Sequence, residues 1–218
     1  MTNIYLIRHC ESMANRMCSF AGRTDVDISA KGALQLECLA EYFKNIKLDA
    51  VYSSPLIRAY KTAEAVTKYN KLPIETVPDL VEMNLGVLDG RPVSDMSDEQ
   101  MYFWNMQPDK FRVEGGETMQ QVAERAFAAL LKIAKENDGK TVAVATHGGV
   151  IRNLMRVIHG YAPTGLGEID WCDNCGINHL IYSGGEFLID FENYKGHLSE
   201  DAAAVPVSEW TEERQQRS

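Results

Sequence analysis

The sequence predicts an α/β fold, a three-layer αβα sandwich with a mostly parallel sheet and a hairpin at its edge. Three observations support this prediction. Short runs rich in β-branched residues alternate along the chain with segments in which apolar residues recur at helical spacing. The clearest run, 141–146, is apolar almost throughout, as expected of a strand covered on both faces. The runs 177–182 and 186–191 are separated only by a Ser-Gly-Gly turn, which is typical of a hairpin.

Most expected elements begin at a recognisable signal. Ser29 and Thr118 stand where helix N-caps are expected, and Thr118 has the pattern of a capping box with Gln121. Ser54 followed by Pro55 predicts another helix start, with Ser54 as the cap and Pro55 in the first helical position. In chain order we expect strands at 4–7, 49–52, 74–77, 141–146, 177–182 and 186–191, helices at 30–45, 55–69, 118–137 and after Gly149, and loops at 13–27 and 79–90.

Two segments depart from this alternation. Residues 101–112 are rich in Met and aromatic residues and contain Pro108, so they are not expected to form one regular helix. From Ser199 the chain is polar, acidic and Ala-rich with little periodicity, and we expect 199–218 to be a tail without a fold of its own. No repeat or break in composition precedes it, so 1–198 is expected to form a single domain.

The composition excludes several classes of protein. The chain has 218 residues, of which 45% are hydrophobic and 24% charged, as in ordinary soluble globules. A formal net charge of -9 argues against nucleic acid or an anionic membrane as the main partner. No apolar run approaches the roughly 20 residues of a membrane-spanning helix, and no signal peptide is evident at the amino terminus. Five cysteines, an odd number, predict reduced thiols and a cytoplasmic location.

Basic and imidazole side chains occur where three predicted strands pass into loops or helices. Arg8 and His9 follow the first strand, Arg58 lies just after the second, and His147 follows 141–146. Arg8-His9 alone could be an ordinary polar turn. The carboxyl ends of parallel strands, however, meet at one edge of a sheet, where ligands bind. Helix N-termini at the same edge favour an anion, and Gly148 lets the backbone come close to it. Together these features predict a pocket for a tetrahedral dianion.

Glu82, in the loop after the third strand, adds the group that phosphoryl transfer requires. A neutral histidine can attack phosphorus while arginines and a second histidine hold the charge of the transferred group. A carboxylic acid can protonate the departing alkoxide and then, as a carboxylate, accept a proton from water. Because Arg8, Arg58 and His147 would supply the positive charge, we expect neither a metal nor another cofactor.

Four motifs occur in order along the chain. They are Leu6-Ile7-Arg8-His9-Cys10-Glu11-Ser12, Ser53-Ser54-Pro55-Leu56-Ile57-Arg58-Ala59, Glu82 with Gly86 and Gly90, and Thr146-His147-Gly148-Gly149. In this order they resemble the histidine phosphatase, or phosphoglycerate mutase-like, superfamily. The resemblance runs from residue 3 to about 198 and implies the fold of that superfamily. It implies that His9 is the phosphorylated nucleophile and Glu82 the proton donor, with Arg8, Arg58 and His147 around the phosphate. It further implies that Asn15 and the backbone near Ala21 and Gly22 close over the substrate.

One position departs from the resemblance. The superfamily usually has Gly where this chain has Cys10, so a side chain lies beside the expected nucleophile. That side chain either crowds the phosphate or points away from it. We expect Cys10→Gly to leave activity intact or to raise it.

The resemblance favours the phosphatase branch over the mutases. Mutases typically follow the catalytic Glu with His-Tyr-Gly and carry a pair of arginines further on, and this chain has neither after Glu82. We therefore expect hydrolysis of a small phosphorylated metabolite, with inorganic phosphate as a product. A phosphoglycerate mutase-type transfer and a non-catalytic phosphate-binding module stay open as alternatives. The segment 101–112 could line the substrate pocket as a lid or belong to the core. The physiological substrate and the oligomeric state are not predicted.

Overall fold

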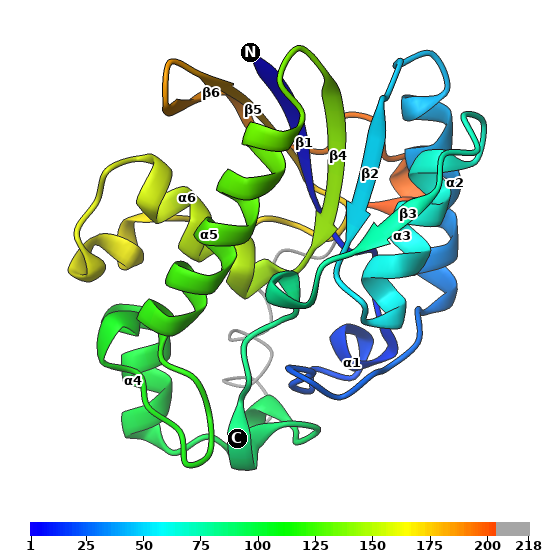
Figure 1. Ribbon diagram of the computed structural model, residues 1–218. Helices are drawn as coiled ribbons and strands as arrows, with labels where there is room; N and C mark the ends of the chain where they lie inside the picture. Colours follow the sequence, from blue (N-terminus) through cyan, green and yellow to red (C-terminus); the bar gives the residue numbers. More distant parts are fainter. Residues whose placement is uncertain (204–218) are drawn as a thin grey trace.

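The computed structural model describes residues 1–203, and a six-stranded sheet lies at its centre (Figure 1). The strands run in the order β3-β2-β4-β1-β5-β6. The first four are mutually parallel, whereas β5 pairs antiparallel with β1 and β6 antiparallel with β5. The mostly parallel sheet with an edge hairpin is confirmed. The strands are β1 (Thr2–Arg8), β2 (Ala50–Ser53), β3 (Ile74–Thr76), β4 (Thr141–Thr146), β5 (Ile177–Ser183) and β6 (Glu186–Tyr194).

Helices cover both faces of the sheet, with α2 and α3 on one side and α5 and α6 on the other (Figure 1). Alternation along the central strands creates the two cores, because successive side chains of a strand point to opposite faces. In β4, Val142 and Val144 belong to the core under α5 and α6, whereas Ala143 and Ala145 face α2 and α3. The helices are α1 (Met13–Arg16), α2 (Ala30–Phe43), α3 (Ile57–Thr67), α4 (Asp98–Met106), α5 (Met119–Glu136) and α6 (Gly148–Ile158).

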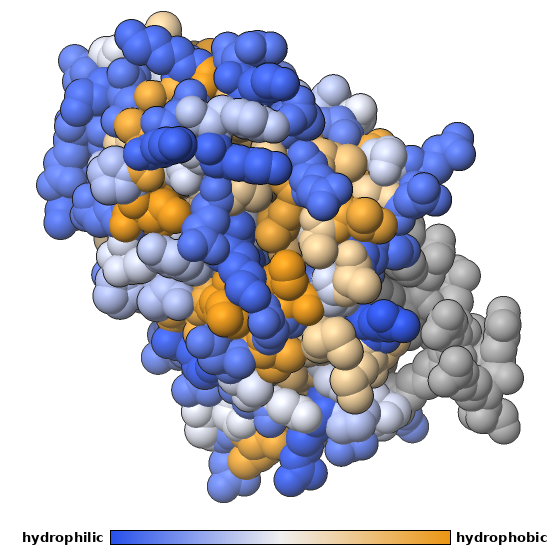
Figure 2. All heavy atoms as spheres, turned by 90° about the vertical axis from the view of Figure 1, so that its right-hand side faces the viewer, coloured by the Kyte–Doolittle hydropathy of each residue, from blue (hydrophilic) through white to orange (hydrophobic). Residues whose placement is uncertain are grey.

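The outer surfaces of α2 and α3 are mainly hydrophilic. Figure 2 looks onto this side of the molecule and shows hydrophilic side chains over most of it, with patches of apolar atoms between them. Within the described residues, no helix is both long enough and apolar enough to cross a bilayer.

The predicted helix caps are partly confirmed. The Ser29 hydroxyl accepts the Gly32 N–H at 3.0 Å, and Thr118 forms the expected capping box with Gln121. The prediction for α3 was wrong, since this helix begins at Ile57 and has no side-chain cap. Ser54 is fully buried at the end of β2, where its hydroxyl lies 2.7 Å from Nε2 of His147. The hydroxyl also accepts the N–H of Leu56, the residue before α3, at 3.3 Å, so Ser54 contacts both His147 and the chain that leads into its own helix.

Two segments expected to lack structure are partly ordered. The loop 13–27 begins with the short helix α1, which Ser12 and Asn15 start with a capping box. The tail predicted from Ser199 includes a 3₁₀ helix, Glu200–Ala202, that packs against α2. Ala202 is fully buried and its carbonyl accepts a hydrogen bond from the Gln35 amide at 3.1 Å. Residues 204–218, the remainder of the predicted tail, lie outside the described residues.

Cys10 points away from the sheet edge and into the core beneath α2 and α3. Its side chain is fully buried among Ile7, Leu39 and neighbouring apolar groups, and burial raises the pKa of the thiol to about 12. Of the two orientations left open by the sequence, the structure therefore has the one that does not crowd the residues beside His9.

We predict that Cys10→Ala lowers the free energy of unfolding by about 1 kcal/mol, because it leaves a small cavity in a packed core. Urea denaturation monitored by circular dichroism measures this change. Cys38→Ala, at a partly exposed position of α2, is the matched control and should stay within about 0.5 kcal/mol of wild type. Equal stability of both variants would contradict the assigned packing of Cys10.

Candidate active site

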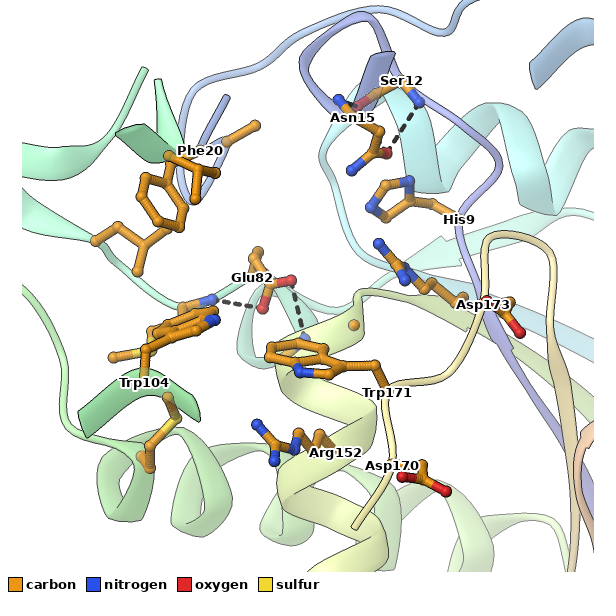
Figure 3. Close-up of a pocket in the computed structure, with 18 of the residues that line it drawn as sticks. His9, Ser12, Asn15, Phe20, Glu82, Trp104, Arg152, Asp170, Trp171 and Asp173 are labelled. Carbon is orange, nitrogen blue, oxygen red and sulfur yellow. Dashed lines mark hydrogen bonds between the residues drawn. The ribbon is translucent and has the colours of Figure 1, made fainter. Parts of the chain in front are cut away.

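A cavity of about 500 Å³ opens at the carboxyl edge of the parallel strands (Figure 3). It brings together side chains that are far apart in the sequence, because residues at the end of β1, on the helices that follow β2 and β4, and in the loop after β3 all line it. Seven of the nine predicted site residues line it, and His147 and Gly22 do not. The predicted residues that line it are Arg8, His9, Asn15, Ala21, Arg58, Glu82 and Gly148.

His9 is held in one tautomer. Its Nδ1 lies 2.6 Å from the Cys10 carbonyl oxygen. A carbonyl can only accept, so Nδ1 carries the proton and Nε2 keeps its lone pair. Burial, followed by the charges of Arg58 and Arg8, lowers the pKa of His9 well below its ordinary value. The ring is therefore neutral near pH 7, with Nε2 available as a nucleophile.

Two buried guanidinium groups flank His9. Arg8 donates from Nη1 to the Cys172 carbonyl, while its buried Nε has no hydrogen-bond partner among the described residues. Arg58 donates to the carbonyls of Ala21, Gly22 and Thr24 at 2.7 to 3.0 Å. Burial lowers the pKa of both arginines, yet an arginine stays protonated at neutral pH. The site therefore has two fixed positive charges next to a neutral histidine.

His147 lies behind the cavity wall and is fully buried. Its ring meets that of His9 edge to face, with centroids 5.1 Å apart. Burial is the main cause that lowers the pKa of His147 well below its ordinary value, and Arg58 and His9 add to it. His147 is therefore neutral and can offer an N–H donor, rather than the positive charge expected from the sequence.

Glu82 is fixed by two backbone amides. Its Oε1 accepts the N–H of Met83 at 2.9 Å and its Oε2 accepts that of Gly149 at 3.1 Å (Figure 3). A Cβ atom at Gly149 would lie 2.6 Å from Oε1 of Glu82, and one at Gly148 would lie 3.2 Å from Nε of Arg8. The two glycines at the start of α6 thus let the helix end approach both the carboxylate and the guanidinium.

The loop 21–24 is held between opposite charges. The Asp89 carboxylate accepts the N–H groups of Gly22, Arg23 and Thr24 at 2.8 to 3.0 Å, on the side opposite the hydrogen bonds from Arg58. Ala21 faces the cavity, whereas the amide of Gly22 is already occupied by Asp89. Gly22 therefore helps to hold Arg58 and does not touch the cavity.

Asn15 faces the cavity from α1, next to His9 in Figure 3. Its Oδ1 accepts hydrogen bonds from the Ser12 amide at 3.0 Å and from the Asn174 side chain at 3.3 Å. Because Oδ1 is engaged in this way, the amide nitrogen of Asn15 is the group that can reach a substrate.

The segment 101–112 contributes both to the core and to the cavity wall. Phe111 is fully buried, whereas Met101 and Trp104 of α4 line the cavity. Trp104 packs edge to face on Phe111 and stacks on Trp171, with ring centroids 4.9 and 5.5 Å apart. In Figure 3, Trp104 lies across the cavity from His9.

Sequence reasoning missed three features of the cavity. Two of them, Trp171 and Arg152, line the cavity. The third, Asp89, holds the loop 21–24 at its edge. Arg152 could have been found by helical spacing, since it follows Gly148 by about one turn on the same helix. Trp171 and Asp89 lie in irregular segments, where no periodicity marks a functional residue.

The model of the histidine phosphatase superfamily (branch 1) matches residues 4–195. The chain belongs to this superfamily. A metal-independent phosphoserine phosphatase of Arabidopsis thaliana is 32% identical over 205 residues, covering 91% of this chain and 84% of the relative. Phosphoserine phosphatase 1 of Hydrogenobacter thermophilus is 31% identical over 203 residues, covering 92% and 96%. Among solved structures, YhfR of Bacillus stearothermophilus superposes with a TM-score of 0.87 at 26% identity, covering 91% of this chain and all of the other.

The resemblance stated from the sequence is therefore confirmed, as is the phosphoglycerate mutase-like fold. The protein is an enzyme, a histidine phosphatase. Among residues 1–203, no cluster of three or more His, Cys, Asp or Glu side chains is arranged to hold a metal ion.

We predict that His9 of this histidine phosphatase stays neutral at pH 6.5, where an ordinary histidine is half protonated. Nitrogen-15 NMR of the ring should show the Nδ1–H tautomer, with His9→Asn identifying the signal. The lowered pKa also has a stability consequence: the folded state binds fewer protons than the unfolded state, so stability is lost as pH falls below about 6.5. A titration midpoint at or above 6.5 would contradict the assigned environment.

We also predict that Asp89→Ala lowers kcat/KM for a phosphomonoester about 10- to 100-fold, because the loop that holds Arg58 loses its anchor. Asp95→Ala, at an exposed position nearby, is the control and should leave kcat/KM unchanged. Steady-state kinetics of the folded variants and of wild type measure this difference in kcat/KM. Wild-type kinetics in Asp89→Ala would show that the hydrogen bonds from Asp89 to the loop 21–24 do not position Arg58.

Proposed function

We propose that this histidine phosphatase hydrolyses phosphomonoesters without a metal, through a phosphohistidine intermediate on His9. The observation that carries the proposal is the state of His9: it is neutral, its Nδ1 donates to the Cys10 carbonyl, and its Nε2 is left as a nucleophile. The two buried arginines beside it provide the positive charge that a phosphoryl group requires.

In the first step, Nε2 of His9 attacks phosphorus and the P–O bond to the alcohol breaks. Glu82, as the carboxylic acid, donates its proton to the departing alkoxide oxygen, and the free alcohol leaves. In the second step the Glu82 carboxylate accepts a proton from water as that water attacks phosphorus. The N–P bond breaks, inorganic phosphate is released, and both His9 and Glu82 regain their starting states.

The charge of the transferred group would be held by fixed donors. Arg8 and Arg58 supply the positive charges, and the N-terminal amides of α6, which begins at Gly148, favour an anion. His147 packs against the His9 ring and would donate an N–H to the phosphoryl group once that group is attached to His9. Asn15 and the backbone at Ala21 would contact the substrate from the opposite side, while Gly22 supports Arg58.

The substrate we propose is a small phosphorylated metabolite. The cavity of about 500 Å³ suits a small molecule, and the names of two relatives, both phosphoserine phosphatases, support this size class. We further propose that 1–198 forms one catalytic domain, which includes every residue that lines the cavity.

The two alternatives fit this site less well. A module that only bound phosphate would not need a carboxylate fixed beside the nucleophile, as Glu82 is. A mutase that works through a bisphosphate must hold a second phosphoryl dianion and exclude water. Beyond Arg8 and Arg58, Arg152 is the one cation among the cavity-lining residues of the described chain.

We predict that wild-type protein hydrolyses p-nitrophenyl phosphate at an unchanged rate in excess EDTA, and that His9→Ala abolishes this activity. His159→Ala, a substitution at the far end of α6, is the matched control and should keep the wild-type rate. Glu82→Gln should lose about 100-fold or more in kcat, since its amide cannot transfer the proton.

Two results would overturn the proposal. A wild-type enzyme inactive from mildly acidic to neutral pH would contradict hydrolysis, and a rate that falls with EDTA would contradict the metal-free mechanism. Rapid interconversion of 3-phosphoglycerate and 2-phosphoglycerate, with a trace of the 2,3-bisphosphate present, would favour the mutase alternative instead.

A further inference from the structure

Arg152 is a buried cation that the hydrolytic mechanism does not use. It lies on α6 and lines the cavity, with only 5% of its surface exposed. At a rise of about 1.5 Å per residue, it stands about 6 Å along the helix from Gly148, which adjoins the proposed phosphate site. It is therefore placed to meet the organic part of a phosphomonoester rather than its phosphoryl group.

The hydrogen bonds of Arg152 are incomplete. Nε donates to the Ile169 carbonyl at 2.8 Å, but the buried Nη1 has no hydrogen-bond partner among the described residues. The guanidinium packs on the ring of Trp171 at 4.7 Å from its centroid. In Figure 3 its end points toward the space between Trp171 and Trp104. The guanidinium thus keeps one donor atom without a protein partner, in a side chain that lines the cavity.

No acidic side chain of the described residues forms an ion pair with Arg152. Asp173 is engaged with Lys195 and Asn193. Asp170 lines the cavity and its charge acts on Arg152, but it forms no ion pair with the guanidinium. Burial lowers the pKa of Arg152 to about 10, which leaves it charged at neutral pH. Burying a cation without an ion-pair partner is unfavourable, so a bound anion would stabilise this arrangement.

The charge of the site favours a carboxylate over a second phosphate. Two arginines and a helix N-terminus surround the proposed phosphoryl site, whereas Arg152 alone provides one positive charge. Asp170 and Asp173 also line the cavity and would repel a dianion. The planar fork of an arginine matches the two oxygens of one carboxylate.

We propose that Arg152 binds a carboxylate on the organic part of the substrate, so that the enzyme prefers phosphorylated small organic acids to neutral phosphomonoesters. This proposal rests on the hydrolytic function proposed above and assigns Arg152 as a specificity-determining residue. The Trp104 and Trp171 rings form the apolar wall beside this subsite and exclude water from the ion pair.

The test compares O-phosphoserine with O-phosphoethanolamine, which differ only in the carboxylate. We expect wild type to show a kcat/KM about 10- to 100-fold higher for O-phosphoserine, the range of a hydrogen bond to a charged group. In Arg152→Met this ratio should fall to within about threefold of unity. Arg156→Met is the matched control, because Arg156 is equally buried on α6 but does not line the cavity, and it should keep the wild-type ratio.

Arg152→Lys provides a second variant if Arg152→Met does not fold, and it should keep part of the preference because it retains the charge. Equal kcat/KM values for the two esters in wild type would overturn the subsite while leaving hydrolysis intact. A loss of both activities in equal proportion in Arg152→Lys would also overturn it. So would a wild-type preference for fructose 1,6-bisphosphate over fructose 6-phosphate that is stronger than the preference for O-phosphoserine over O-phosphoethanolamine. Failure of wild type to hydrolyse any ester, p-nitrophenyl phosphate included, would instead reject the proposed function itself.

Discussion

The burial of Arg8 and Arg58 at the carboxyl edge of the sheet is the constraint on which the rest of the site depends. Neither side chain is exposed by more than 5%, so each guanidinium needs acceptors inside the protein. Carbonyls of the loop 21–24 serve Arg58, and Asp89 fixes that loop from its other side. Burial, with the same two charges adding to it, lowers the pKa of His9 and keeps it neutral. One electrostatic arrangement thus creates an anion site and a nucleophile next to it.

The loop just before β5 contributes to this arrangement through the Asn174 side chain and the Cys175 amide. The Asn174 side chain donates to the His9 carbonyl at 3.0 Å, and the Cys175 amide lies within hydrogen-bond distance of the same oxygen. These contacts fix the backbone of His9 just after β1, while the Cys10 carbonyl fixes its ring. The tautomer of the proposed nucleophile therefore comes from a main-chain carbonyl, and its position comes from the Cys175 amide together with the Asn174 side chain.

How much could be predicted from the sequence depended on whether a feature is local. The strands, and the polar residues that follow them, were predicted because hydrophobic patterns mark strands and parallel strands end at one edge. The hydrogen-bond partners and the burial of those residues could not be predicted from such patterns. Ser54 appeared to be a helix cap because its partner, His147, is 93 residues away. The charge assigned to His147 failed for a similar reason, since the burial that lowers its pKa is a property of the folded chain.

The central claim is that His9 itself becomes phosphorylated, and direct trapping of the intermediate tests it. The enzyme is mixed with a phosphomonoester, quenched within milliseconds in alkali, where phosphohistidine is stable, and digested for mass spectrometry. We predict one added phosphoryl group on the peptide that contains His9, and none in His9→Ala. A hydrolytically active enzyme that carries no phosphoryl group on His9 at any time, or that carries it on another residue, would contradict the account.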